Sequence, residues 1–236
     1  GASMGRPYIP ARMEDNPYLD TIAYEESLAQ LDPVTRQQLR DGDWDASIAG
    51  GLFQRHWFPI VADWPRAARL VRCWDLAGTE PSAQNPDPDW TCGALLAYQA
   101  GQYWVVDVQR FRLSPKKVED RIAQQAALDG QATEVLIEQE PGSSGKTVIE
   151  DFQRRVLTGY SVRGIPSTGS KLERAKPAAS AAEAKNILLV EGPWITAFLE
   201  TLCLFPNGKH DDDMDVLSMG VNYLGIPTKR VGTWGS

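Results

Sequence analysis

Three groups of carboxylates occupy positions where an acidic side chain suggests a bound ligand. Asp75 ends the apolar run of residues 69–74, and Glu138 ends a second apolar run, residues 133–137. The third group is His210-Asp211-Asp212-Asp213-Met214-Asp215, at the start of a helix-like segment. An unpaired charge at the end of a buried strand is costly because it loses its hydration. Hard divalent cations such as Mg²⁺ take oxygen ligands and would compensate this cost. Two metal ions held by carboxylates are a recurring arrangement for phosphodiester hydrolysis, so these residues point to metal-dependent nuclease chemistry.

The C-terminal group gives the strongest local signal. A helix beginning near Asp212 would place one apolar stripe on the core, made of Met214, Leu217, Val221 and Leu224. At about 100° per residue, Asp211, Asp212 and Asp215 then share an arc away from that stripe, whereas Asp213 falls on the other side and is the weakest candidate ligand. The helix dipole favours aspartate at this end and accounts for one or two carboxylates. Four aspartates in five positions repel one another, so a bound cation explains the group better.

Several individual assignments stay open from the residues alone. Asp75 could be an ordinary turn aspartate that bonds its own backbone. Glu140 lies two positions after Glu138, points to the same face and is the alternative ligand. His210 could bind metal, cap the helix or orient a water, and a surface histidine is an equal alternative.

Candidate phosphate contacts lie in two segments. Gly142-Ser-Ser-Gly-Lys-Thr147 resembles the end of a nucleotide-binding loop, but Glu140 occupies the position of the opening glycine and would repel phosphates. This excludes nucleotide hydrolysis by this segment, although Lys146 could still contact a DNA phosphate. Lys171 and Arg174 are three residues apart, so one helix face could present both to neighbouring phosphates, or both could be solvated.

The elements that position these residues alternate along the chain. Expected strands cover residues 70–74, 91–98, 103–110, 134–137, 160–165 and 187–190. Expected helices cover residues 115–128, 144–157, 171–185 (broken at Pro177), 194–203 and 212–224. This pattern predicts an α/β fold in which one mixed sheet carries helices on its faces. The loop of residues 79–89 leaves the first strand, so it is expected to overhang the site.

Composition limits the possible functions. The 236 residues carry a net charge of −7, so the chain lacks the overall basic character of a strong, autonomous DNA binder. The three cysteines form no C-x-x-C pair, which disfavours a zinc site or a disulfide framework. No apolar run approaches the roughly 18 residues of a membrane span, so no membrane partner is expected. Residues 1–4 look like a cloning scar.

The chain resembles the C-terminal part of the large terminase subunit of tailed bacteriophages. The resemblance is carried by an ordered set of motifs, which are Asp15-Asn-Pro-Tyr-Leu-Asp20, Arg40-Asp-Gly-Asp-Trp44, Trp74-Asp-Leu-Ala77, Ile137-Glu-Gln-Glu-Pro-Gly142, Lys171-Leu-Glu-Arg-Ala175 and Phe205-Pro-Asn-Gly-Lys-His-Asp-Asp212 continuing to Asp215-Val-Leu-Ser218. It implies a ribonuclease H-like nuclease domain over residues 61–228 and a C-terminal tail at 229–236. Residues 5–60 would be a linker or hinge from a preceding ATPase domain that is absent here.

The resemblance also implies the site and the partners. Asp75, Glu138, Asp212 and Asp215 match the catalytic, metal-binding acids. Asp75 would bridge two Mg²⁺ or Mn²⁺ ions, Glu138 would hold one, and Asp212 and Asp215 the other. The expected activity is cutting of double-stranded viral DNA during genome packaging, with little sequence specificity. Expected partners are the ATPase domain, the small terminase subunit and the portal protein, in the host cytoplasm. The alternatives are a Holliday-junction resolvase or transposase, and a noncatalytic Ca²⁺-binding module.

Overall fold

The computed structural model describes residues 51–77 and 80–226. The expected cloning scar at residues 1–4, the motifs of the expected linker before residue 51 and the expected tail at 229–236 lie outside the described residues. The domain boundary at residue 60 therefore stays a prediction. Within the described part, Phe53 and Phe58 are buried in the main core, and the first strand begins at Ile60.

The centre of the molecule is a seven-stranded mixed sheet with the order β1-β7-β4-β3-β2-β5-β6. Its strands are β1 (Ile60–Val61), β2 (Arg69–Asp75), β3 (Thr91–Gln99), β4 (Gln102–Phe111), β5 (Glu134–Gln139), β6 (Val162–Pro166) and β7 (Ile187–Val190). β2, β3 and β4 form an antiparallel meander. β5 runs parallel to β2 and pairs with β6, and β7 runs parallel to β4 and pairs with β1. All six expected strands are present.

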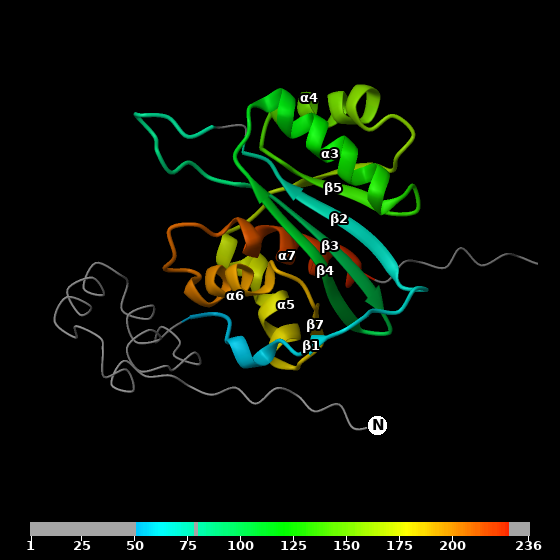
Figure 1. The fold of residues 1–236 in the computed structure, drawn as a ribbon, viewed down its shortest axis with the longest axis vertical. Helices are drawn as coiled ribbons and strands as arrows, with labels where there is room; N and C mark the ends of the chain where they lie inside the picture. The colour runs from blue at the N-terminus through cyan, green and yellow to red at the C-terminus, as the bar shows by residue number, and fades with distance from the viewer. Residues whose placement is uncertain (1–50, 78–79, 227–236) are drawn as a thin grey trace, which may run out of the picture.

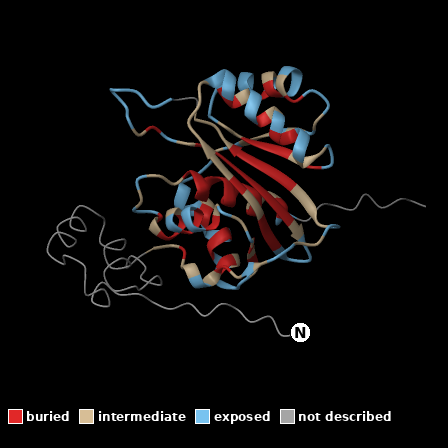
Figure 2. Cartoon of the chain, viewed as in Figure 1, coloured by how far each residue is buried: buried red, intermediate tan, exposed pale blue. Residues whose placement is uncertain are grey.

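Helices cover both faces of the sheet (Figure 1). α3 (Pro115–Asp129) and α4 (Ser143–Asp151) lie on one face, and α5 (Lys171–Glu183), α6 (Ile195–Leu204) and α7 (Asp212–Leu224) lie on the other. The strands between these two layers are largely buried (Figure 2). Each layer has its own apolar cluster, one around Trp74 under α3 and α4, and a larger one under α5, α6 and α7.

Local sequence explains where these elements begin. Ala100 and Gly101 both have positive φ, 51° and 87°, as a two-residue hairpin between β3 and β4 requires. Pro115 stands at the start of α3, where its missing N–H costs nothing. Ser170 and Glu173 form a reciprocal capping box at the start of α5.

Two expectations about helices were wrong. The helix expected over residues 144–157 ends at Asp151 and continues as a five-residue π-helical turn, η3 (Phe152–Val156). There the Leu157 N–H donates to the Phe152 carbonyl at 2.8 Å, and the wider winding lets both side chains enter the Trp74 cluster.

The break expected at Pro177 is absent, because α5 continues through it. Proline removes one intrahelical hydrogen bond and crowds the preceding turn. Four alanines of α5 are nevertheless buried in the core shared with α7, and this packing holds the helix together. They are Ala175, Ala178, Ala179 and Ala182. No described helix has the length and apolar character needed to cross a bilayer.

Candidate metal centre

The sheet brings Asp75 and Glu138 together through the register of two parallel strands. Trp74 of β2 pairs with Ile137 of β5, so the next residue along each strand, Asp75 and Glu138, lies at the same edge of the sheet. Both follow apolar residues that anchor their strands in the core. The ends of two buried parallel strands thus place two carboxylates side by side.

Asp215 completes the group from the first turn of α7. One carboxylate oxygen each of Asp75, Glu138 and Asp215 lie within 4.8 Å of one another. Asp215 is buried, and the other two are partly buried. The three acids line a cavity of about 330 Å³ together with Lys171 and Glu140. Three hard oxygen donors converging on one open cavity fit a divalent cation such as Mg²⁺ or Mn²⁺.

The electrostatics of Asp75 indicate the same requirement for positive charge. Burial first, and then the nearby charges of Glu138, Asp215 and Asp212, raise the pKa of Asp75 to about 8 against the opposing charge of Lys171. Near neutral pH, the Asp75 carboxyl is therefore mostly protonated, and a bound metal ion would take the place of this proton. A divalent cation in the cavity would favour the ionised form of Asp75.

The four C-terminal aspartates have different surroundings. Asp213 is buried, accepts a hydrogen bond from Arg110 Nε at 2.9 Å and also contacts the Cys92 thiol, so it faces away from the cavity. Asp213 is thus set apart from Asp215, as helical geometry predicts. Asp211 is bound by Lys171 at 2.7 Å. Asp212 is buried, and its pKa is raised to about 6, first by burial, but it is not one of the three converging acids. Its role as a ligand stays a prediction.

The other candidate ligands lie outside the three-acid group. Glu140 lines the cavity but is exposed. His210 Nε2 lies 3.0 Å from Asp87 Oδ2. Asp87 belongs to the loop that leaves β2, and it also binds Lys209 and Arg112, so this loop is tied to the segment that precedes α7. The hydrogen bonds from Lys209 and His210 lower the pKa of Asp87 well below its usual value.

The candidate phosphate contacts divide into two kinds. Lys146 is exposed on α4, in the first turns of a helix that begins after Gly142, so the glycine-rich segment starts a helix. Lys171 and Arg174 do share one face of α5, as their spacing predicts, and this face is turned toward the acids. Contact with DNA stays a prediction for all three.

The sequence did not indicate that the basic side chains of Lys171 and Arg174 form ion pairs with these acids. Lys171 Nζ lies 2.8 Å from Asp215 Oδ2, and Arg174 Nη2 lies 2.8 Å from Asp215 Oδ1 and 3.6 Å from Glu138 Oε1. Ser167, after β6, donates a hydrogen bond to Glu138. These residues lie far from the acids in sequence, so no local pattern predicts the contacts. The spacing of Lys171 and Arg174 predicts only that they share a helix face.

Comparison with known proteins identifies the family. Residues 72–224 match the family described as the terminase RNaseH-like domain. The chain belongs to this family. The matched residues run from Arg72 in β2 to Leu224 at the end of α7, so they include all three converging acids. Of the seven strands, only β1 and the first three residues of β2 lie outside the match.

Solved structures show the same fold. The large terminase nuclease from thermophilic phage G20c, with bound magnesium, matches at a TM-score of 0.56 and 14% identity, covering 74% of this chain and 98% of that one. The human cytomegalovirus terminase nuclease domain, soaked with Mn and with an inhibitor bound, matches at 0.53 and 15%, covering 73% and 94%. A large terminase from a second thermophilic bacteriophage matches at 0.52 and 14%, covering 92% of this chain and 55% of that one.

These matches confirm the ribonuclease H-like fold of this terminase domain. The chain spans about half the length of the large terminase from the second thermophilic phage. Comparison with curated proteins gave no match.

Proposed function

We propose that this terminase domain is a metal-dependent endonuclease that cuts double-stranded viral DNA during genome packaging. The observation that carries the proposal is the convergence of Asp75, Glu138 and Asp215 within 4.8 Å, from two strand ends and a helix, in a domain of this family. The magnesium in the phage G20c relative supports the choice of cation.

The proposed reaction is hydrolysis of a phosphodiester with two Mg²⁺ or Mn²⁺ ions. Asp75, Glu138 and Asp215 would hold the ions, with Asp212 as a further ligand. Bound divalent cations would neutralise phosphate charge and lower the pKa of an attacking water. The chain itself supplies a rigid frame, because the acids stand on buried strands and on a buried helix turn. DNA affinity would come from phosphate contacts, so it should fall with salt and depend little on sequence.

The biological setting is part of the proposal. The ATPase domain of a full-length large terminase, the small terminase subunit and the portal protein would direct the cut in the host cytoplasm. An acidic domain with net charge −7 is poorly suited to capture DNA alone, so partners that deliver DNA fit its composition.

The test is cleavage of supercoiled plasmid with Mn²⁺, Mg²⁺, Ca²⁺ or EDTA. We expect nicked and linear products with Mn²⁺ or Mg²⁺, and none with EDTA or with Asp75→Asn. Asp63→Asn is the matched control, because Asp63 is exposed and pairs with Arg66 away from the cavity. Cleavage that survives in Asp75→Asn would refute the assigned site. Selective cutting of four-way junctions would favour a resolvase, and stabilisation by Ca²⁺ without cutting would favour a noncatalytic module.

A further inference from the structure

Lys171 and Arg174 both form ion pairs with the same carboxylate, that of Asp215. Asp215 Oδ2 contacts Lys171 Nζ, and Asp215 Oδ1 contacts Arg174 Nη2, each at 2.8 Å. In addition, Lys171 reaches Asp211 at 2.7 Å, and Arg174 reaches Glu138 at 3.6 Å. Both oxygens of Asp215 are thus taken by side chains of α5. A divalent ion that uses Asp215 therefore meets a positively charged side chain at whichever oxygen it binds.

When a metal ion approaches, the side chains of Lys171 and Arg174 can move, whereas Asp215 is held in place. The Asp215 side chain is only 3% exposed, whereas Lys171 is 48% and Arg174 21% exposed. Long basic side chains keep an apolar stem in place while the charged end swings into solvent. Burial lowers the pKa of Lys171, but its hydrogen bonds to Asp211 and Asp215 outweigh this effect, so the side chain stays charged.

We propose that Lys171 and Arg174 are exchangeable counter-ions that couple metal binding to DNA binding. Without metal they neutralise Asp215 and its neighbours. When divalent ions take these acids, the two cations turn to the phosphates next to the cleaved bond. This inference rests on the proposed nuclease function, because it assumes that the cavity receives both divalent ions and DNA.

The balance of charge in the site explains why the exchange favours DNA binding. Lys171 and Arg174 together contact three carboxylates, those of Glu138, Asp211 and Asp215, so the metal-free site is negative and repels phosphates. Bound divalent ions reverse this balance and release the two side chains. Since coupling between two ligands is reciprocal, DNA should strengthen metal binding by the same factor.

A permanent structural bridge between α5 and α7 is the competing interpretation. In that case the two cations would stay on Asp215 in every state. Removing them would then lower stability without changing the dependence of DNA binding on metal. The two interpretations differ in two equilibrium measurements that need no cleavage.

The first measurement is calorimetric titration of the 236-residue chain with Ca²⁺ in the absence of DNA. Lys171→Gln and Arg174→Gln should each bind Ca²⁺ more tightly, by about fivefold, because Ca²⁺ no longer has to displace a basic side chain from Asp215. Lys176→Gln is the matched control, since Lys176 is an exposed lysine of the same helix, and its affinity should equal that of the parent chain. Thermal melting of each variant establishes that it is folded.

The second measurement is fluorescence anisotropy of a labelled DNA duplex in Ca²⁺ or EDTA at equal ionic strength. The parent chain should bind at least about fivefold more tightly in Ca²⁺. The two glutamine variants should lose most of this gain, and Lys171→Arg should keep it. Unchanged Ca²⁺ affinity in the glutamine variants, or a full gain in DNA affinity despite them, would overturn the exchange. Either result could occur while the parent chain still cuts plasmid, so the nuclease proposal is tested separately.

Discussion

Asp213 and Asp215 occupy the same turn of α7 but form ion pairs with basic side chains on different elements. Asp213 is paired with Arg110 of β4, and Asp215 is paired with Lys171 and Arg174 of α5. Only Asp215 converges with Asp75 and Glu138. Two neighbouring aspartates thus have separable roles, one in holding the helix on the sheet and one in the candidate metal centre.

Substitution of these two residues should give opposite defects. Asp213→Asn leaves Arg110 without its charge partner, so the free energy of unfolding should fall by roughly 2–4 kcal/mol. Asp215→Asn should leave the chain folded but reduce plasmid cleavage at least about 100-fold, since losing even an indirect partner of a metal ligand can cost that much. Urea unfolding and cleavage assays on both variants check the prediction. Equal loss of cleavage in two equally stable variants would contradict it.

The stability of the metal-free chain should fall as pH rises from about 4 to about 8. The pKa of Asp75 is raised from 3.8 to about 8, so the folded state holds its proton where the unfolded state has lost it. The stabilisation is therefore complete below pH 3.8 and is lost as pH rises through about 8. Asp212, whose pKa is raised to about 6, adds an effect of the same sign. Urea unfolding in EDTA across this range measures the slope, and Asp75→Asn should flatten it.

Magnesium should stabilise the chain more at about pH 8 than at about pH 6. A divalent ion binds the ionised carboxylate, so below the raised pKa of Asp75 it must displace a proton, and affinity falls by about tenfold per pH unit. The rise in Tm with added Mg²⁺ should grow accordingly. Asp75→Asn provides the comparison, and its smaller rise in Tm should depend less on pH. A parent chain whose rise is the same at both values would argue against Asp75 as a ligand.

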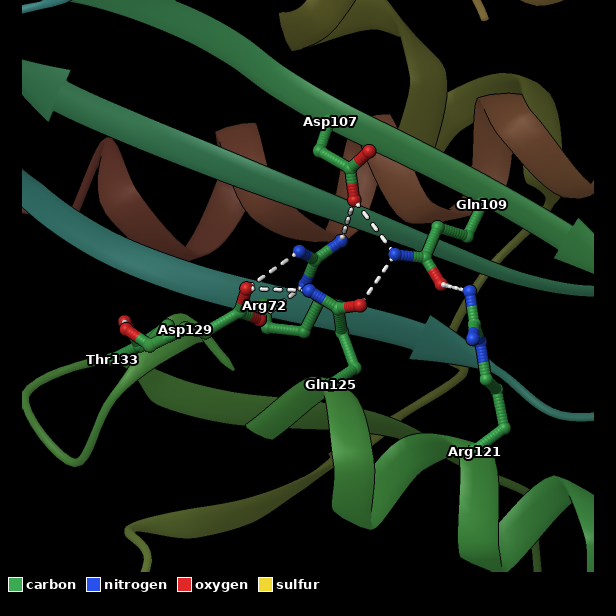
Figure 3. Close-up of polar contacts among 7 residues, drawn as sticks. All are labelled: Arg72, Asp107, Gln109, Arg121, Gln125, Asp129 and Thr133. Atoms are coloured by element: carbon green, nitrogen blue, oxygen red, sulfur yellow. Dashed lines mark hydrogen bonds and ion pairs between the residues drawn. The ribbon is translucent and has the colours of Figure 1, made fainter. Parts of the chain in front are cut away.

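A buried network on the other face of the sheet should be sensitive to a single substitution. Arg72 is 1% exposed and donates to Asp129 at 2.6 and 2.9 Å and to Asp107 at 2.9 Å (Figure 3). Asp129→Ala removes the main charge partner of Arg72, so the free energy of unfolding should fall by about 3–5 kcal/mol. Arg121→Ala, at the exposed edge of the same network, should cost less than about 1 kcal/mol. Chemical denaturation distinguishes the two, and similar losses would show that Arg72 is otherwise compensated.

The sequence was most informative where residues adjacent in the chain determine the result. Apolar runs marked β2 and β5 and the acids that end them, Asp75 and Glu138. The meeting of these two acids follows from the parallel pairing of the strands, which the runs alone do not specify. Helical spacing separated Asp213 from the other aspartates of α7. These predictions depend on strand alternation and helical geometry, which local sequence specifies.

Long-range packing determined what the sequence could not show. Helical spacing gives an arc of acids but not the rotation of α7 against the sheet, so it could not separate Asp212 from Asp215. The partners of Lys171 and Arg174 lie on β5 and α7, far away in sequence. Buried alanines also kept α5 continuous at Pro177, where local propensity predicts a break.

The order of the acids along the chain has a consequence for synthesis. Asp75, Glu138 and Asp215 lie on three elements, of which α7 is made last. A domain generally folds as a unit, so this one cannot complete its fold before α7 has been made. Until α7 packs onto the sheet, the growing polypeptide presents two carboxylates without the third, and has no complete cation site. Any cutting activity would therefore be withheld from incomplete chains and would begin only when α7 docks.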